Sequence, residues 1–170
     1  ISLLLCVVLL CPAFSLALET DGSTIHIKTQ QDLQELAENC KLDTWSQDKT
    51  VVLDNNLTLD ETASEFLPIP TFGGTFNGNG YTISDLSLNG EDSRTGLFDT
   101  LQASASINNL SVVGDVTPSG NSDTIGGLAG KNYGKINSCY FEGKIQGTDS
   151  VGGLVGINET TGQMINCHFK

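Results

Sequence analysis

The chain has 170 residues and a formal net charge of −12, from 8 basic and 20 acidic side chains. This acidity argues against nucleic acid and anionic lipid surfaces as partners. The two histidines form no His-Glu-x-x-His motif, and no Gly-x-Ser-x-Gly sequence occurs, so a metallopeptidase helix and a serine-hydrolase nucleophile are both absent from the sequence. We therefore predict no catalytic, cofactor or metal residues. Structural calcium at an acidic turn stays an open alternative, without an EF-hand loop to support it.

The N-terminus reads as a secretory signal peptide. No charged residue occurs in the first 18 positions, and an apolar run extends from Leu3 to Leu10. Pro12 and Ser15 interrupt this run before the roughly 20 apolar residues that a membrane span needs. We predict a signal peptide over residues 1–17, with retention as an anchor as the alternative. We therefore expect a secreted or cell wall-associated protein with no membrane insertion after cleavage, and a natural start that precedes Ile1.

Residues 19–48 are predicted to form an N-terminal strand and a capping helix. Apolar residues alternate from Ser23 to Lys28, as in a strand. Thr29 then provides an N-cap with Asp32 three residues later. The following apolar stripe has helical spacing, so this helix should cover the first coil of a repeat structure. The stripe consists of Leu33, Leu36, Ala37 and Cys40.

Residues 49–170 are predicted to form short strands separated by turns. Pro68 and Pro70 flank Ile69, so this segment belongs at a corner or a sheet edge. The Asn-Gly-Asn-Gly sequence at 77–80 offers places where positive φ is accessible, which a tight corner between two strands requires. Since a strand ends the sequence at Lys170, we expect further coils or domains beyond it.

A repeated phrase organises this region. Gly-Gly-Leu-Ala-Gly at 126–130 returns 26 residues later as Gly-Gly-Leu-Val-Gly at 152–156, and Gly96-Leu97-Phe98 begins an earlier copy. The strands that begin at Ile107, Ile136 and Met164 are separated by 29 and 28 residues. This period matches one rung of a parallel β-helix better than a propeller blade. The predicted fold is thus all-β: a right-handed parallel β-helix of about four to five coils. The structural repeat residues are Gly96, Leu97, Phe98, Gly126, Gly127, Leu128, Gly130, Asn132, Cys139, Gly152, Gly153, Leu154, Gly156, Asn158 and Cys167.

Like residues should stack in successive coils. Asn132 over Asn158 would form one amide ladder, and Asn108, Asn137 and Asn166 a second. Cys139 and Cys167 occupy equivalent places and are interpreted as buried hydrophobes, with a disulfide between them as the alternative. The inward positions are predicted to include Ile83, Leu86, Leu97, Leu110, Leu128, Ile136, Leu154 and Val155.

These phrases resemble the GLUG-motif family of bacterial surface proteins, over roughly residues 50–170. The resemblance implies right-handed parallel β-helix repeats of the kind found in adhesins and in accessory regions of IgA-protease-type metallopeptidases. It supplies no catalytic residues to transfer. One departure is Asp99, where the family commonly has Gly after Gly-Leu-Phe, which should loosen that corner.

The sequence favours a non-catalytic surface module for adhesion, ligand presentation or spacing. A glycan or a host surface protein is the plausible partner, although nothing in the sequence identifies it. The alternative is a polysaccharide lyase or hydrolase, because other parallel β-helices cleave acidic polysaccharides with clustered carboxylates. Arg94 is the only arginine, which leaves little basic surface to hold an acidic sugar. The candidate carboxylates are Asp85, Asp115, Asp123, Glu142, Asp149 and Glu159.

Overall fold

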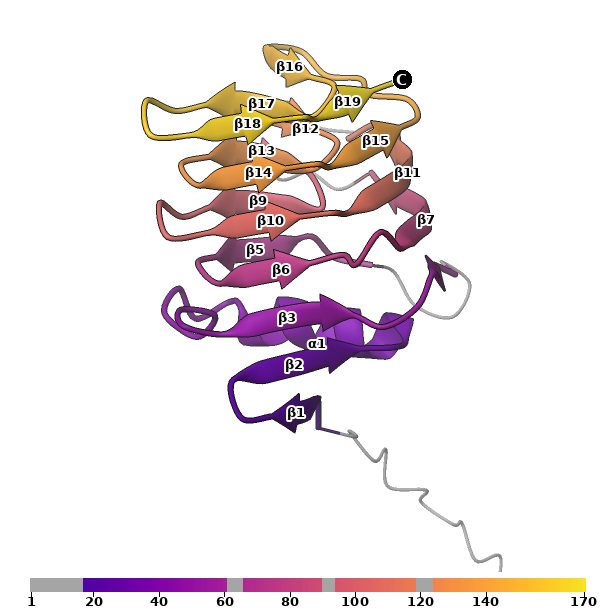
Figure 1. The fold of residues 1–170 in the computed structure, drawn as a ribbon. Coiled ribbons are helices and arrows are strands. Elements are labelled where there is room, and N and C mark those ends of the chain that lie inside the picture. Colours follow the sequence, from indigo (N-terminus) through magenta and orange to yellow (C-terminus); the bar gives the residue numbers. More distant parts are fainter. Residues whose placement is uncertain (1–16, 61–65, 90–93, 119–123) are drawn as a thin grey trace, which may run out of the picture.

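The computed structural model describes residues 17–60, 66–89, 94–118 and 124–170. The chain winds into a parallel β-solenoid of about five turns, with one short helix near its N-terminal end (Figure 1). The all-β fold class and the repeat architecture predicted from the sequence are confirmed. The signal peptide predicted for 1–17 lies almost entirely outside the described residues. The divisions at 19–48 and 49–170 stay predictions.

Four sheets, which we name A to D, form the walls of the solenoid. Sheet A has the order β1 (Glu19–Asp21), β2 (Thr24–Ile27), β3 (Thr50–Leu53), β6 (Thr75–Asn77), β10 (Ser106–Asn108), β14 (Lys135–Asn137) and β18 (Gln163–Ile165). Sheet B consists of β4 (Leu57–Thr58), β7 (Thr82–Leu88), β11 (Ser111–Val116), β15 (Tyr140–Glu142) and β19 (His168–Phe169). Sheet C consists of β5 (Ile69–Phe72), β9 (Phe98–Leu101), β13 (Ala129–Asn132) and β17 (Val155–Asn158). Sheet D consists of β8 (Arg94–Thr95), β12 (Thr124–Gly126) and β16 (Ser150–Gly152).

The N-terminal end is covered by a strand and a helix. β1 pairs antiparallel with β2, so it occupies the outer edge of sheet A. The helix, α1 (Gln30–Asn39), begins with the capping box formed by Thr29 and Asp32. It packs against β2 and against β5, the edge strand of sheet C. The predicted apolar stripe faces inward, since Leu33, Leu36, Ala37 and Cys40 are all buried.

The core is a set of apolar rows that run along the solenoid axis. In sheet A, Ile25, Val51, Phe76, Ile107 and Ile136 are paired in successive strands and are buried. The ring of Phe76 also meets those of Phe72 and Phe98, with the three centroids 5.4 to 6.3 Å apart. All inward residues predicted from the sequence are buried except Leu154, which is half-buried. Leu154 lies in the last coil, where no further described coil covers it.

Positive φ angles mark the corners between sheets A and B. Asn79 and Gly80 have φ of 53° and 77°, so the predicted tight corner at 77–80 is confirmed. Asn109, Ser138 and Asn166 repeat the conformation in the next three coils, each with φ of 53°.

The proline segment also fits its prediction, because β5 contains Pro70 and forms an edge of sheet C. Among the described residues, no helix is both long enough and apolar enough to span a membrane.

Candidate binding face and the repeat that builds it

The repeated glycines lie where strands of sheet D contact strands of sheet C. Gly126 ends β12, and a Cβ there would lie 2.3 Å from the carbonyl oxygen of Ala129. Gly152 and Gly156 are equally confined by backbone atoms of the neighbouring strands. Backbone cannot move aside as a flexible side chain can, so these positions exclude a side chain. The repeat thus encodes a corner in which two sheets meet without side chains between them.

The second glycine of each phrase provides space for an aromatic ring from sheet B. A Cβ on Gly127 would lie 2.4 Å from the ring of Phe141, and one on Gly153 would lie 2.3 Å from the ring of Phe169. The two rings stack with centroids 6.2 Å apart. In the Gly96-Leu97-Phe98 coil the phrase has a single glycine, and Val112 stands in the row that contains Phe141. A ring and a second glycine therefore occur together.

The neighbouring repeat residues complete the corner. Leu97, Phe98 and Leu128 are buried in the core. Gly130 lies in β13, in register between Asp99 and Gly156. Asp99 is therefore at the predicted glycine position and is accommodated within β9.

Asn132 and Asn158 are in register, as the first predicted ladder requires. The Asn132 side chain is fully buried, and its Nδ2 donates to Oδ1 of Asn158 at 2.8 Å. Its Oδ1 accepts from the backbone N–H of Gly134 at 3.0 Å. Asn158 donates in turn to the carbonyl of Gly162 at 3.0 Å. Each amide thus fixes the corner that leads from sheet C into sheet A.

Cys139 and Cys167 occupy equivalent places in successive coils, and both are free thiols. The alternative of a disulfide between them is therefore not what the structure shows. Cys139 is buried, and burial raises the pKa of its thiol to about 11. Cys40, on the inner side of α1, is also a free thiol, and burial raises its pKa to about 12. Cys167 is only partly buried. Its position in the last coil accounts for the difference, because Cys139 is covered on both sides.

The second predicted amide ladder is wrong in one member. Asn108 pairs with Asn137, but the next residue in register is Ile165 rather than Asn166. Asn166 instead takes the left-handed corner conformation, for which Asn is well suited. The row extends in the other direction, to Asn77. Asn77, Asn108 and Asn137 therefore form an amide row on the outward side of sheet A.

A second row of polar side chains runs beside the amide row. Thr24, Thr50, Thr75 and Ser106 are in register and alternate with the buried residues of sheet A, so their hydroxyls face outward. We call these four residues the hydroxyl row. This row was not predicted from the sequence, although the triplets Thr75-Phe76-Asn77 and Ser106-Ile107-Asn108 carry its signal.

The two rows make sheet A a flat polar face. Neighbouring parallel strands are about 4.8 Å apart, so the rows repeat at that spacing. Asn108 Nδ2 donates to Ser106 Oγ at 3.1 Å, which links the rows within one strand. Asn77 Oδ1 accepts from the backbone N–H of Asn79 at 3.0 Å. The two rows thus present preoriented hydroxyl and amide groups, and the next residues in register are Lys135 after Ser106 and Val52 before Asn77.

The candidate carboxylates separate into two groups. Glu142 accepts from Tyr140 at 2.7 Å and pairs with Lys170 at 2.8 Å, and the hydrogen bond from Lys170 lowers the pKa of the Glu142 carboxyl. Glu159 pairs with Lys131 at 2.7 Å. By contrast, Asp85 and Asp115 line one surface hollow of about 400 Å³ beside the bulge between β7 and β11. Asp149 is exposed in a turn, and Asp123 lies outside the described residues.

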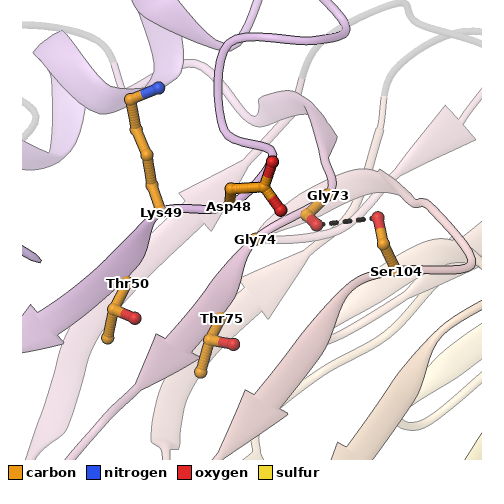
Figure 2. A pocket seen from close by; sticks show the side chains of 7 residues that line it. All are labelled: Asp48, Lys49, Thr50, Gly73, Gly74, Thr75 and Ser104. Atoms are coloured by element: carbon orange, nitrogen blue, oxygen red, sulfur yellow. Dashed lines mark hydrogen bonds between the residues drawn. The ribbon is translucent and has the colours of Figure 1, made fainter. Parts of the chain in front are cut away.

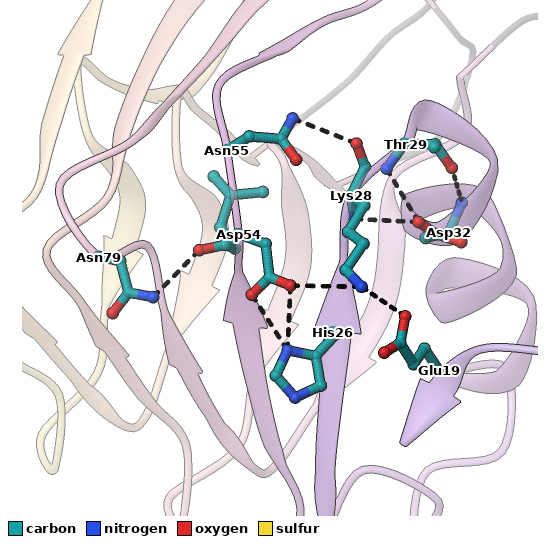
Figure 3. A network of polar contacts seen from close by, with 9 residues as sticks. Glu19, His26, Lys28, Thr29, Asp32, Asp54, Asn55 and Asn79 are labelled. Atoms are coloured by element: carbon teal, nitrogen blue, oxygen red, sulfur yellow. Dashed lines mark hydrogen bonds and ion pairs between the residues drawn. The ribbon is translucent and has the colours of Figure 1, made fainter. Parts of the chain in front are cut away.

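A polar network ties the N-terminal elements together (Figure 3). His26 Nδ1 lies 3.0 Å from Oδ1 of Asp54, and Lys28 Nζ lies 3.9 Å from Oδ2 of the same carboxylate. Lys28 also donates to Glu19, and this hydrogen bond raises the pKa of the Lys28 ammonium. Asn79 Nδ2 donates to the carbonyl of Leu53 at 3.1 Å. The network joins β1, β2, the end of β3 and the next coil, so it serves the N-terminal cap.

Across the described part of the chain, no group of three or more His, Cys, Asp or Glu side chains could hold a metal ion.

Comparison with known proteins matches the last coil to a described motif. The GLUG motif model matches residues 147–170. The chain is 36% identical over 96 residues to Halomucin of Haloquadratum walsbyi, an alignment that covers 56% of this chain and 1% of halomucin. It is 39% identical over 73 residues to a Gly-rich membrane protein of Evansella cellulosilytica, covering 42% of this chain and 8% of that protein. No solved structure matches the chain significantly.

The matched residues extend from the turn before β16 to the end of β19. They contain the second Gly-Gly-Leu-x-Gly phrase and its Phe169, and strands β16, β17 and β19 pair in register with β12, β13 and β15 one coil earlier. The chain spans only a small share of the length of the relatives it matches. The chain thus carries the GLUG motif on a parallel β-solenoid.

Proposed function

We propose that the chain is a non-catalytic repeat module of a secreted or cell-surface protein, and that the outward face of sheet A is its ligand-binding face. The names of the two relatives, Halomucin and a Gly-rich membrane protein, support a surface location. The observation that carries the proposal is the pair of polar rows on one flat sheet, in register through successive coils.

The chemistry of the face favours a glycan. Hydroxyl and amide groups both donate and accept hydrogen bonds, which matches the hydroxyl groups of a sugar. Their regular spacing suits a ligand that is itself a repeating polymer. The two rows carry no aromatic side chain, whereas the centres of protein–protein interfaces are enriched in aromatic residues.

A glycan array tests the proposal. The full chain is applied after a circular dichroism spectrum of β type has established that it is folded. Reproducible binding to polysaccharides, lost when the amide row is removed, is the expected result. A folded protein that binds no glycan would contradict the binding role and leave a spacer.

One observation favours a second candidate, a polysaccharide-cleaving enzyme. Asp85 and Asp115 line the same hollow, and glycosidic cleavage needs two carboxyl groups about 5 to 9.5 Å apart. Its test is incubation with acidic polysaccharides, followed by assays for new reducing ends and for the ultraviolet absorbance of unsaturated products. Activity that disappears in Asp85→Asn and Asp115→Asn would replace the non-catalytic proposal.

A further inference from the structure

A polar hollow of about 210 Å³ opens at the edge of sheet A (Figure 2). Its lining includes Thr50 and Thr75 of the hydroxyl row, at the first residues of β3 and β6. Asp48 and Ser104 line it from the loops that lead into sheet A. The hollow is therefore continuous with the polar face, and one carboxylate is added to the hydroxyl groups there.

The walls of the hollow are fixed by hydrogen bonds between distant parts of the chain. Ser46, which is fully buried, accepts from the N–H of Gly73 at 2.9 Å. Ser104 Oγ donates to the carbonyl of Gly73 at 2.8 Å, and the N–H of Thr75 donates to the carbonyl of Lys49 at 2.9 Å. A Cβ on Gly74 would lie 2.4 Å from the carbonyl oxygen of Ser46. The loop before β3 is thus held against the next two coils, and a site on such a support is preorganised for a ligand.

Two residues with charged side chains, Asp48 and Lys49, line the hollow, and only the Asp48 carboxylate is free to face a ligand. Lys49 is the adjacent residue, but its Nζ donates to the carbonyl of Trp45 and lies 4.8 Å from the centroid of the Trp45 ring. Figure 2 shows the Lys49 side chain turned away from the Asp48 carboxylate. Anionic ligands would meet an unpaired negative charge there, which excludes uronates and phosphates.

The volume of the hollow and the polar groups that line it indicate which class of ligand it binds. Pockets that bury whole drug-sized ligands measure about 300 to 1,000 Å³, so this hollow suits a single ring. A carboxylate and hydroxyl groups match the vicinal hydroxyls of a sugar, which donate to carboxylate oxygens and exchange hydrogen bonds with Thr and Ser. A calcium ion needs six to eight oxygen ligands, and this lining contains one carboxylate.

From these observations we propose that the Asp48 hollow is a subsite for one neutral pyranose residue. The Asp48 carboxylate accepts hydrogen bonds from two neighbouring sugar hydroxyls, and Thr50, Thr75 and Ser104 contact the same ring. The remainder of the glycan continues onto the hydroxyl row. This subsite deepens the glycan-binding function proposed above. It rests on that function for the path of the longer glycan, which runs from the hollow along the hydroxyl row.

The test is an NMR titration of the full chain with glucose, galactose, mannose and N-acetylglucosamine, each as the free sugar. We expect amide shifts at Asp48, Gly73, Gly74 and Ser104 with at least one of these sugars. Asp48→Asn should weaken this binding about tenfold, the loss expected when a charged hydrogen-bond acceptor becomes neutral. Asn tolerates the positive φ of 60° found at Asp48, so the variant should keep its fold.

The matched control is Asp43→Asn, an exposed carboxylate outside the hollow, which should leave the affinity unchanged. Shifts confined to the amide row and insensitive to Asp48→Asn would overturn the subsite while leaving the proposed binding face intact. No shift with any of the four sugars would overturn the subsite alone, because the array with polysaccharides tests the face separately. Shifts at Asp48 with calcium chloride but with no sugar would replace it with a cation site.

Discussion

The ring of Phe141 packs directly on Gly127, so closely that a Cβ on Gly127 would lie 2.4 Å from the ring carbons. The contact joins sheet B to the corner between sheets D and C across the interior of one coil. Phe141 is fully buried, so its ring cannot move into solvent. Gly127 and Phe141 therefore act as one packing unit, repeated one coil later as Gly153 and Phe169.

Gly127→Ala should destabilise the fold by about 2 kcal/mol or more, because overpacking of a filled core typically costs 1 to 3 kcal/mol. Combining it with Phe141→Val should recover part of this loss of stability. In the coil with the single glycine, Val112 occupies the position in register with Phe141. Gly153→Ala is the matched comparison, and it should cost less because Phe169 is 48% exposed. Urea unfolding of the parent and the three variants measures these differences. Equal costs at Gly127 and Gly153 would contradict the account.

Leu128→Asp should unfold the coil that contains it. Leu128 is 1% exposed, and an unpaired buried charge costs several kcal/mol. Leu42→Asp is the matched control, because Leu42 is 62% exposed and should tolerate the same substitution. Thermal melting followed by circular dichroism distinguishes the two variants. A Leu128→Asp protein that melts like the parent would mean that the inward face has been assigned wrongly.

Asn132→Ala should destabilise the protein by about 1 to 3 kcal/mol, because the N–H of Gly134 and Oδ1 of Asn158 lose their partner. Asn158→Ala should cost less, since Asn158 is exposed in the last coil. Asn132→Asp should be the most harmful, because it sets a buried carboxylate against an acceptor oxygen. Chemical unfolding of the three variants gives the order. Equal effects of Asn132→Ala and Asn158→Ala would show that the ladder adds nothing beyond local contacts.

The buried thiols predict a loss of stability in alkaline solution. Burial raises the pKa of Cys139 from 9.0 to about 11 and that of Cys40 from 9.0 to about 12, so the native state holds these protons more tightly than the unfolded chain. Their contribution to stability is complete below about pH 9 and is lost as the pH rises toward 11 to 12. Cys139→Ala should flatten the pH dependence above pH 9. Unfolding free energies of the parent and the variant at several alkaline pH values give the result, and identical slopes would refute the burial argument.

The same burial should separate the cysteines by reactivity. A thiolate is the reactive form, and both burial and a raised pKa suppress it at Cys139 and Cys40. Among the three cysteines in the described part of the chain, Cys167, which is only partly buried, should therefore react first with a thiol reagent in the native protein. Mass spectrometry of the labelled protein identifies the modified residue. Labelling of Cys139 ahead of Cys167 would be the contrary result.

Local patterns in the sequence were sufficient to predict several features of this structure. The stripe from Leu33 to Cys40 predicted α1, and the period of the glycine phrases predicted a stack of parallel coils. The first pattern depends on residues close together in the sequence, and the second on a phrase that returns after 26 residues. The register of the first amide ladder also followed, since Asn132 and Asn158 hold the same place relative to their glycines.

Features that depend on exact coil length were not predictable in this way. Asn166 was placed in an amide row, but the register brings Ile165 there and leaves Asn166 at the corner. The hydroxyl row appears only when strands with different loop lengths between them are aligned. The hollow at Asp48 depends on contacts from Ser46 to Gly73 and from Ser104 to Gly73, which span 27 and 31 residues. No local pattern encodes such contacts.

One comparison of variants decides whether the outward face of sheet A binds the ligand. Binding to the best glycan from the array is measured for the parent, for the variant Asn77→Ala with Asn108→Ala, and for the control Thr71→Ala with Thr100→Ala on sheet C. We expect the sheet A variant to lose binding about tenfold or more with little change in melting temperature, while the control binds like the parent. Unchanged binding by the sheet A variant, or an equal loss in the control, would contradict this binding role.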